Sequence, residues 1–264
     1  MRLKPLVWCG ILLFLLGCTT TQEGGEPNTI TVFAAASLTE AFTELGVHYE
    51  KTHPDVQVVF NFAGSQQLAQ QLGQGAPGDV FASANEKQMM NVVENGRILP
   101  NTPQPFTHNE LIVIFPADNP GNITKLSDLT NPGLKIVMAT EEVPVGAYSM
   151  QFLQAASGVD GLGGGFETAV LTNVVSYEQN VRSVFSKVAL GEADAGIVYS
   201  SDVGVNTQSD VGQIEIPPQW NVLATYPIAP LADSTQPKHA QDFINFVVSS
   251  EGQQILDMYG FRGK

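Results

Sequence analysis

The feature that most constrains the fold is a predicted strand that passes through small residues directly into a helix. Residues 30–33 favour a strand, Ala34–Ala36 follow, and residues 38–51 have helical apolar spacing. Ser37 and Glu40 have the spacing of a capping box. Small side chains let a ligand approach the backbone, and the unpaired N–H groups of a first helical turn favour an anion. On this stretch alone, the simpler interpretation is that Ser37 only caps its helix. The alternative is that the stretch forms half of a site for an oxyanion.

The same alternation of strand and helix continues through the first half of the chain. Strands are expected at 56–62 and 79–83, and helices at 66–72 and 86–93, with a small-residue turn ending in Ser65. A β-α-β-α-β-α order predicts a mostly parallel sheet covered by helices on both faces. Ligands of such sheets bind at the carboxyl ends of strands, and both Ser37 and Ser65 lie where a strand gives way to a helix.

A second series of strands and helices follows in the second half. Its expected strands are residues 111–115, 134–139, 174–175, 196–199, 214–216 and 226–228, and its helices are 147–156, 166–173, 181–190, 240–248 and 251–259. Residues 72–83 resemble residues 190–201, since both run from a helix end through a glycine-containing turn into a buried strand and a serine. This similarity favours two related lobes with a cleft between them.

The charge of the chain limits what it can bind. The 264 residues carry a formal net charge of −14, so no basic stripe is available to neutralise nucleic-acid phosphates. Any anion must therefore be held by local dipoles against the overall field. The length is enough for one large or two medium domains.

The first residues have the pattern of a lipoprotein signal. Arg2 and Lys4 precede an apolar run, Leu6–Leu16, and Cys18 follows it closely, as in a bacterial lipobox. We predict a signal peptide at 1–17, lipidation at Cys18 and a tether at 18–28, which places the protein outside the cytoplasmic membrane with a lipid anchor. The alternative is an ordinary signal peptide with an incidental cysteine. The mature chain would have no disulfide and no cysteine metal site, because Cys9 lies inside the signal.

Sequence motifs of enzymes are absent. The chain has no G-x-S-x-G, H-E-x-x-H, P-loop or strand-linked G-x-G-x-x-G motif, and its histidines (His48, His53, His108 and His239) lack metal-ligand spacing. We therefore expect a binding protein without a cofactor and without a protein-coordinated metal.

Polar and small residues at predicted helix starts suggest a set of hydrogen-bond donors. Ser37, Ser65, Val145 and Val181 each lie at or near a helix start, and Tyr199 ends a strand. Each residue alone has an ordinary structural explanation. Together they form a donor-only set, which suits a fully deprotonated oxyanion.

Four segments, in order, resemble the extracytoplasmic molybdate-binding proteins of ABC importers, over about residues 29–264. The segments are Val32–Thr39, Gly75–Phe81, Val143–Tyr148 and Gly196–Asp202. The resemblance implies an α/β fold of the two-lobed type II periplasmic-binding-protein class. Each lobe would have a mostly parallel sheet, with lobe 1 formed by 29–112 plus 224–264 and lobe 2 by 113–223.

The resemblance also implies the ligand, its contacts and the partners. The ligand would be molybdate or tungstate, and the contacts would be Ser37, Ser65, Val145, Val181 and Tyr199, with the two valines using only their backbone N–H groups. The partners would be an ABC permease and its ATPase, and the protein would be a monomer. One departure is the turn before Ser65, where Gly64 stands and some family members have a run of serines.

Three alternatives stay open from the sequence. The same fold could bind sulfate or another tetrahedral anion, or it could serve a sensory receptor without transport. A secreted hydrolase using Ser37 or Ser65 would need a base near the serine, and no histidine lies in either turn.

Overall fold

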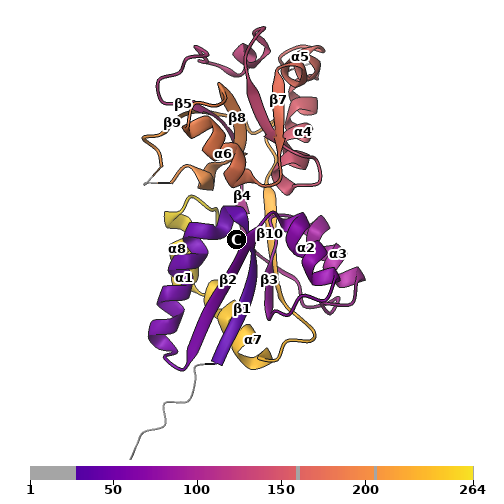
Figure 1. The fold of residues 1–264 in the computed structure, drawn as a ribbon, viewed down its shortest axis with the longest axis vertical. Helices are drawn as coiled ribbons and strands as arrows, with labels where there is room; N and C mark the ends of the chain where they lie inside the picture. The colour runs from indigo at the N-terminus through magenta and orange to yellow at the C-terminus, as the bar shows by residue number, and fades with distance from the viewer. Residues whose placement is uncertain (1–27, 159–160, 205–206, 264) are drawn as a thin grey trace, which may run out of the picture.

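The computed structural model describes residues 28–158, 161–204 and 207–263, and it has two lobes, each built on one five-stranded sheet (Figure 1). The first sheet contains β1 (Asn28–Ala35), β2 (Val56–Ala63), β3 (Val80–Ala82), β4 (Gln104–Asn109) and β10 (Ala224–Pro230). The second contains β5 (Leu111–Pro116), β6 (Ile136–Ala139), β7 (Val174–Glu178), β8 (Ala195–Tyr199) and β9 (Val211–Glu215). The predicted signal peptide, the lipidated Cys18 and the tether up to residue 27 lie outside the described residues.

The two sheets have the same plan. Their strand orders are β2-β1-β3-β10-β4 and β7-β6-β8-β5-β9. In each sheet the first three strands are parallel and the last two add antiparallel pairings. The similarity between residues 72–83 and 190–201 has a structural basis, because β3 and β8 occupy the same position in the two orders.

The sheets are therefore mixed, where the sequence predicted mostly parallel ones. The alternation of strands and helices correctly predicted the parallel part. The antiparallel part comes from β4, β5, β9 and β10, the strands that adjoin the two crossings between the lobes. Parallel neighbours need a crossover connection, usually a helix, and not every one of these four strands is followed by one. β4 was missing from the expected strands.

The chain crosses between the lobes twice. Glu110 separates β4 of the first sheet from β5 of the second, and residues 216–223 lead back from β9 to β10. The predicted boundary at 112/113 falls inside β5, two residues after the change of sheet; the return at 223/224 coincides with the start of β10.

Helices cover both faces of the first sheet. The helices are α1 (Thr39–Thr52), α2 (Ser65–Gly73), α3 (Glu86–Glu94), α7 (Pro237–Val247) and α8 (Ser250–Met258). Phe42 of α1 packs edge-to-face on Phe106 of β4, with ring centroids 5.7 Å apart. Phe81 of β3 faces a separate buried cluster with Leu68 and Met89, so α2 and α3 lie on the other face.

The second lobe places two long helices against its sheet. They are α4 (Pro144–Ala156) and α6 (Val181–Ala189), with the short α5 (Phe166–Thr172) beside α4. α4 begins three residues before the predicted start at 147, because Pro144 fits the first position of a helix, where no N–H is needed. This start brings Val145 into the first turn. Within the three described ranges, no helix has the length and apolarity needed to span a membrane.

Candidate ligand-binding site

The five predicted contact residues line one pocket between the lobes. Ser37 and Ser65 come from the first lobe, and Val145, Val181 and Tyr199 come from the second. The cavity itself is small, about 10 Å³, and it opens to solvent. Each residue follows the carboxyl end of a strand or, for Tyr199, ends one, which is where ligands of such sheets bind.

Most of the helix starts at the pocket have no side-chain cap. The residues before the first turns of the 3₁₀ helix η1 (Ala36–Leu38), α2 and α4 are Ala35, Gly64 and Val143, and none of them caps its helix through a side chain. Asn180 does cap α6, but its Oδ1 accepts from the third residue, Ser183, at 3.0 Å. The first amides of these helices have no acceptor within the helix and are left available to a ligand.

The predicted capping box at Ser37 is wrong. Ser37 lies inside η1, and α1 begins at Thr39 without a side-chain cap. The 3₁₀ turn moves Ser37 away from the capping position, and its Oγ lies 2.9 Å from the hydroxyl oxygen of Tyr226. Glu40, the expected reciprocal partner, pairs instead with Arg182 of the second lobe.

Ser65 is held as a donor by the main chain. Its side chain is buried, and its Oγ accepts a hydrogen bond of 3.0 Å from the backbone N–H of Ala84. The hydroxyl hydrogen remains for another acceptor. Ala84 also lines the pocket, although nothing in the local sequence pattern marked it, because it only follows β3.

Tyr199 brings a hydroxyl that lacks a partner. The side chain is 1% exposed, and its hydroxyl has no hydrogen-bond partner among the described residues. Burial raises the pKa of Tyr199 well above its ordinary value, so the phenol stays protonated. An unpaired buried O–H is costly unless a ligand accepts from it.

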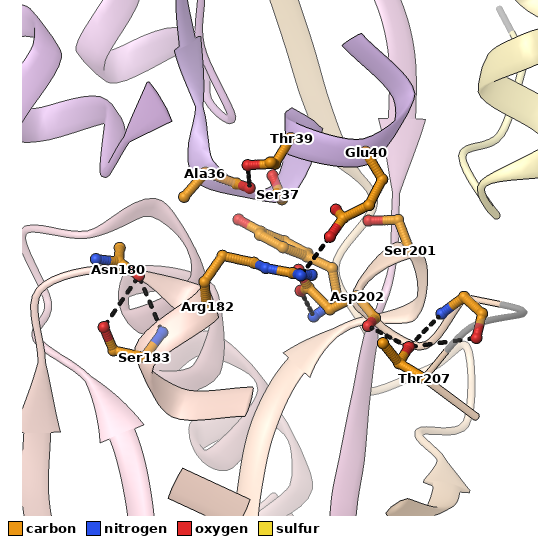
Figure 2. A network of polar contacts seen from close by, with 12 residues as sticks. Ala36, Ser37, Thr39, Glu40, Asn180, Arg182, Ser183, Ser201, Asp202 and Thr207 are labelled. Atoms are coloured by element: carbon orange, nitrogen blue, oxygen red, sulfur yellow. Dashed lines mark hydrogen bonds and ion pairs between the residues drawn. The ribbon is translucent and has the colours of Figure 1, made fainter. Parts of the chain in front are cut away.

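Arg182, which follows the pocket residue Val181 in sequence, is paired with carboxylates that do not line the pocket. Figure 2 shows the guanidinium of Arg182 directed toward Glu40 and Asp202, and its Nη1 lies 3.8 Å from Asp202 Oδ1. Burial raises the pKa of Asp202 to about 7, although Arg182 opposes the shift. No lysine or arginine is among the described residues that line the pocket.

Gly146 allows α4 to approach the end of β6. A Cβ atom on Gly146 would lie 2.6 Å from the carbonyl oxygen of Ala139 and even closer to that of Thr140. This close packing fixes the first turn of α4 and the direction of the Val145 amide.

The resulting site is a small pocket of hydrogen-bond donors. Two serines, one tyrosine and first-turn residues of several helices line it, and no carboxylate is among the described lining residues. Among the described residues, no cluster of histidine, cysteine and acidic side chains is arranged to hold a metal ion. The chemistry offered is reversible binding of a small oxyanion.

A pair of similar α/β lobes with a ligand pocket between them defines the class of solute-binding proteins. Residues 30–262 match the family model of bacterial extracellular solute-binding proteins, and the chain belongs to this family. The molybdate-binding protein ModA of Mycobacterium tuberculosis is 37% identical over 97% of this chain and 95% of its own length. The sequence-based resemblance to molybdate-binding proteins is thereby confirmed.

Solved structures agree on the fold. The periplasmic molybdate-binding protein of Azotobacter vinelandii superposes with a TM-score of 0.75 at 20% identity, covering 88% of this chain and 98% of its own. The sulfate-binding protein SubI of Mycobacterium tuberculosis gives a TM-score of 0.80 at 19% identity, covering 89% and 87%. The predicted two-lobed type II periplasmic-binding-protein fold is confirmed.

Proposed function

We propose that this protein binds molybdate, and also tungstate, outside the cytoplasmic membrane and delivers the anion to an ABC permease with its ATPase. The observation that carries the proposal is the pocket lined by Ser37, Ser65, Val145, Val181 and Tyr199, whose hydroxyls and first-turn amides can donate hydrogen bonds to an anion. The identity to molybdate-binding proteins over nearly the whole chain supports the same ligand.

The donor set suits a dianion without a protein cation. Removing a dianion from water is costly unless hydrogen bonds replace its hydration. Charge-assisted N–H···O⁻ and O–H···O⁻ bonds are about twice as strong as neutral ones, and helix N-termini add a favourable dipole. The uncapped starts of η1, α2 and α4 provide such amides.

Selectivity follows from the donors and from the size of the pocket. A pocket without an acceptor leaves the hydroxyl of protonated phosphate unpaired, which penalises that ligand. Sulfate has the same charge and shape as molybdate but shorter bonds, so a pocket sized for molybdate holds it with stretched hydrogen bonds. Tungstate is nearly the same size as molybdate and is accepted.

Calorimetry with an anion panel tests the proposal. Purified mature protein is titrated with molybdate, tungstate, sulfate and hydrogen phosphate, with and without Ser65→Ala. We expect tight binding of the first two anions only, weakened roughly 10–100-fold by Ser65→Ala, as for loss of one bond to a charged group. Sulfate binding as tight as molybdate binding would show that the protein is a sulfate receptor instead.

Ligand binding is coupled to closure of the lobes in this proposal. Donors on both lobes contact the same anion, so the anion favours the closed form, which the permease recognises. Lipidation at Cys18 keeps the monomeric protein at the membrane. Replacing Cys18 with serine should release the protein from the membrane fraction while leaving the anion affinity of the purified protein unchanged.

A further inference from the structure

The pocket works as a donor-only site only if its hydroxyl groups point their hydrogens at the ligand. A serine hydroxyl can donate or accept, so its direction depends on its other partner. For Ser65 that partner is the N–H of Ala84, which can only donate. For Ser37 the partner is the hydroxyl of Tyr226, which could itself act either way.

The direction of the Tyr226 hydroxyl follows from hydrogen bonds of Asn109, which lies next to the first crossing between the lobes. The N–H of Glu110, the residue at the first crossing, donates to Oδ1 of Asn109 at 3.0 Å. This bond fixes which end of the Asn109 amide is the oxygen. Its Nδ2 group therefore faces the other way, and it donates to Ser201 Oγ at 2.7 Å and to the Tyr226 oxygen at 3.4 Å.

Tyr226 is thereby left with one direction for its own hydrogen. Its oxygen accepts from Asn109, and Ser37 Oγ, at 2.9 Å, is the other polar atom within hydrogen-bond distance among the residues that the structure describes. If Ser37 donated to Tyr226, the buried tyrosine hydrogen would have no acceptor there, so the satisfied arrangement has Tyr226 donating to Ser37 Oγ. Both Tyr226 and Asn109 are fully buried, so water does not offer a substitute partner. Burial also raises the pKa of Tyr226 far above its ordinary value, and the phenol keeps its proton.

We propose that Tyr226, oriented by Asn109, is a positioning residue that fixes the Ser37 hydroxyl as a hydrogen-bond donor to the bound oxyanion. Tyr226 does not line the pocket and acts through Ser37. The proposal rests on the proposed function, since it assigns a direction to one donor of that site. It also explains how one pocket keeps two serines as donors by different means, a main-chain amide for Ser65 and a tyrosine for Ser37.

A double-mutant cycle measures whether Tyr226 acts through Ser37. Wild-type protein, Ser37→Ala, Tyr226→Phe and the double variant are titrated with molybdate by calorimetry. We expect Tyr226→Phe to weaken molybdate binding roughly tenfold in the wild-type background and by less than about twofold when Ser37 is already alanine. Equal losses in both backgrounds, or no loss in the wild-type background, would overturn the proposal.

Selectivity provides a second readout that a purely structural role would not change. Without a donor behind it, the Ser37 hydroxyl can turn and accept the proton of hydrogen phosphate. The ratio of molybdate affinity to hydrogen phosphate affinity should therefore fall in Tyr226→Phe. If this ratio is unchanged in Tyr226→Phe, the proposal is contradicted. This test remains available even if Ser37→Ala binds molybdate too weakly for the double-mutant cycle.

Tyr49→Phe is the matched control. Tyr49 is another fully buried tyrosine of the first lobe, its hydroxyl has no partner among the described residues, and it does not line the pocket. It should leave both affinities unchanged, and thermal unfolding should show that every variant is folded. If wild-type protein fails to bind molybdate, the proposed function fails; if it binds and Tyr226→Phe has no effect, only this inference fails.

Discussion

Arg182, at the start of α6, pairs across the cleft with Glu40 of α1, so one ion pair joins the two lobes beside the pocket. The two side chains are 29% and 39% exposed, and such partly exposed pairs contribute up to about 1 kcal/mol. We expect Glu40→Gln to weaken molybdate binding by no more than about fivefold. The loss should shrink at high salt, which calorimetry at low and high ionic strength would measure.

Glu44→Gln is the control for this pair. Glu44 lies one turn further along α1, and it accepts a 2.6 Å hydrogen bond from Tyr259, which belongs to the same lobe. Its loss breaks a contact within one lobe and should not change the affinity. Similar effects of the two substitutions would show that the ion pair has no role in closure.

The buried carboxyl of Asp202 should make stability depend on pH. Its pKa is raised from 3.8 to about 7 in the folded protein, chiefly by burial. Between these values the folded protein holds a proton that the unfolded chain has released, so the free energy of unfolding falls as pH rises from about 4 to about 7. A shift of this size corresponds to about 4 kcal/mol.

Asp202→Asn should remove this part of the pH dependence. Urea unfolding of both proteins between about pH 4 and pH 8 would measure it. The exposed Asp118 offers the control, because Asp118→Asn should keep the wild-type slope. If the free energy of unfolding of Asp202→Asn fell with pH as steeply as that of the wild-type protein, another group would be responsible for the pH dependence.

Tyr199→Phe should change stability and binding in opposite directions. The hydroxyl of Tyr199 is buried and has no hydrogen-bond partner in the described part of the chain, so its removal should stabilise the ligand-free protein by up to about 1 kcal/mol. The same change removes a donor to the anion, and molybdate binding should weaken roughly 10–100-fold. Thermal unfolding without ligand and calorimetry would measure the two effects. A loss of both ligand-free stability and molybdate affinity would indicate that Tyr199 has a purely structural role.

The local signals in the sequence were sufficient for the five predicted residues that line the pocket, and insufficient for Ala84 and for the hydrogen-bond partners of the pocket residues. Ser65 and Val181 were predictable because a strand end followed by a helix start is visible within about ten residues. Ser37 was placed correctly beside the pocket, but its partner Tyr226 is 189 residues away, and no local pattern connects them. The capping-box interpretation failed because a 3₁₀ turn intervenes.

The same distinction between local signals and distant contacts explains which parts of the fold were predicted. The parallel strands were predicted from their alternation with helices. β4 was missed because residues 104–109 contain a proline and alternate poorly, and only pairing with β10 makes them a strand. The antiparallel pairings depend on where the chain crosses between lobes, which composition and periodicity do not encode.

Gly146→Ala should impair both folding and binding. The added Cβ would meet the carbonyl oxygens at the end of β6, so α4 must shift and carry the Val145 amide with it. Overpacking of this kind costs about 1–3 kcal/mol. Gly164→Ala is the control, since no atom of the described residues lies within 4 Å of a Cβ there. Denaturant unfolding and calorimetry should show losses only for Gly146→Ala; normal binding by that variant would contradict the proposed role of the Val145 amide.

Ser37→Ala should weaken anion binding more than it weakens the fold. The substitution removes one neutral hydrogen bond to Tyr226, worth about 1 kcal/mol of stability, and one donor to a charged ligand, worth roughly 1.5–3 kcal/mol of binding. Ser249→Ala is the comparison, because Ser249 caps α8 through a 3.2 Å bond from the Gly252 N–H and does not line the pocket. Its loss should cost about 1 kcal/mol of stability and leave molybdate affinity unchanged. Calorimetry and urea unfolding of both variants separate the two roles, and matching losses of affinity and stability in Ser37→Ala would reduce Ser37 to a structural residue.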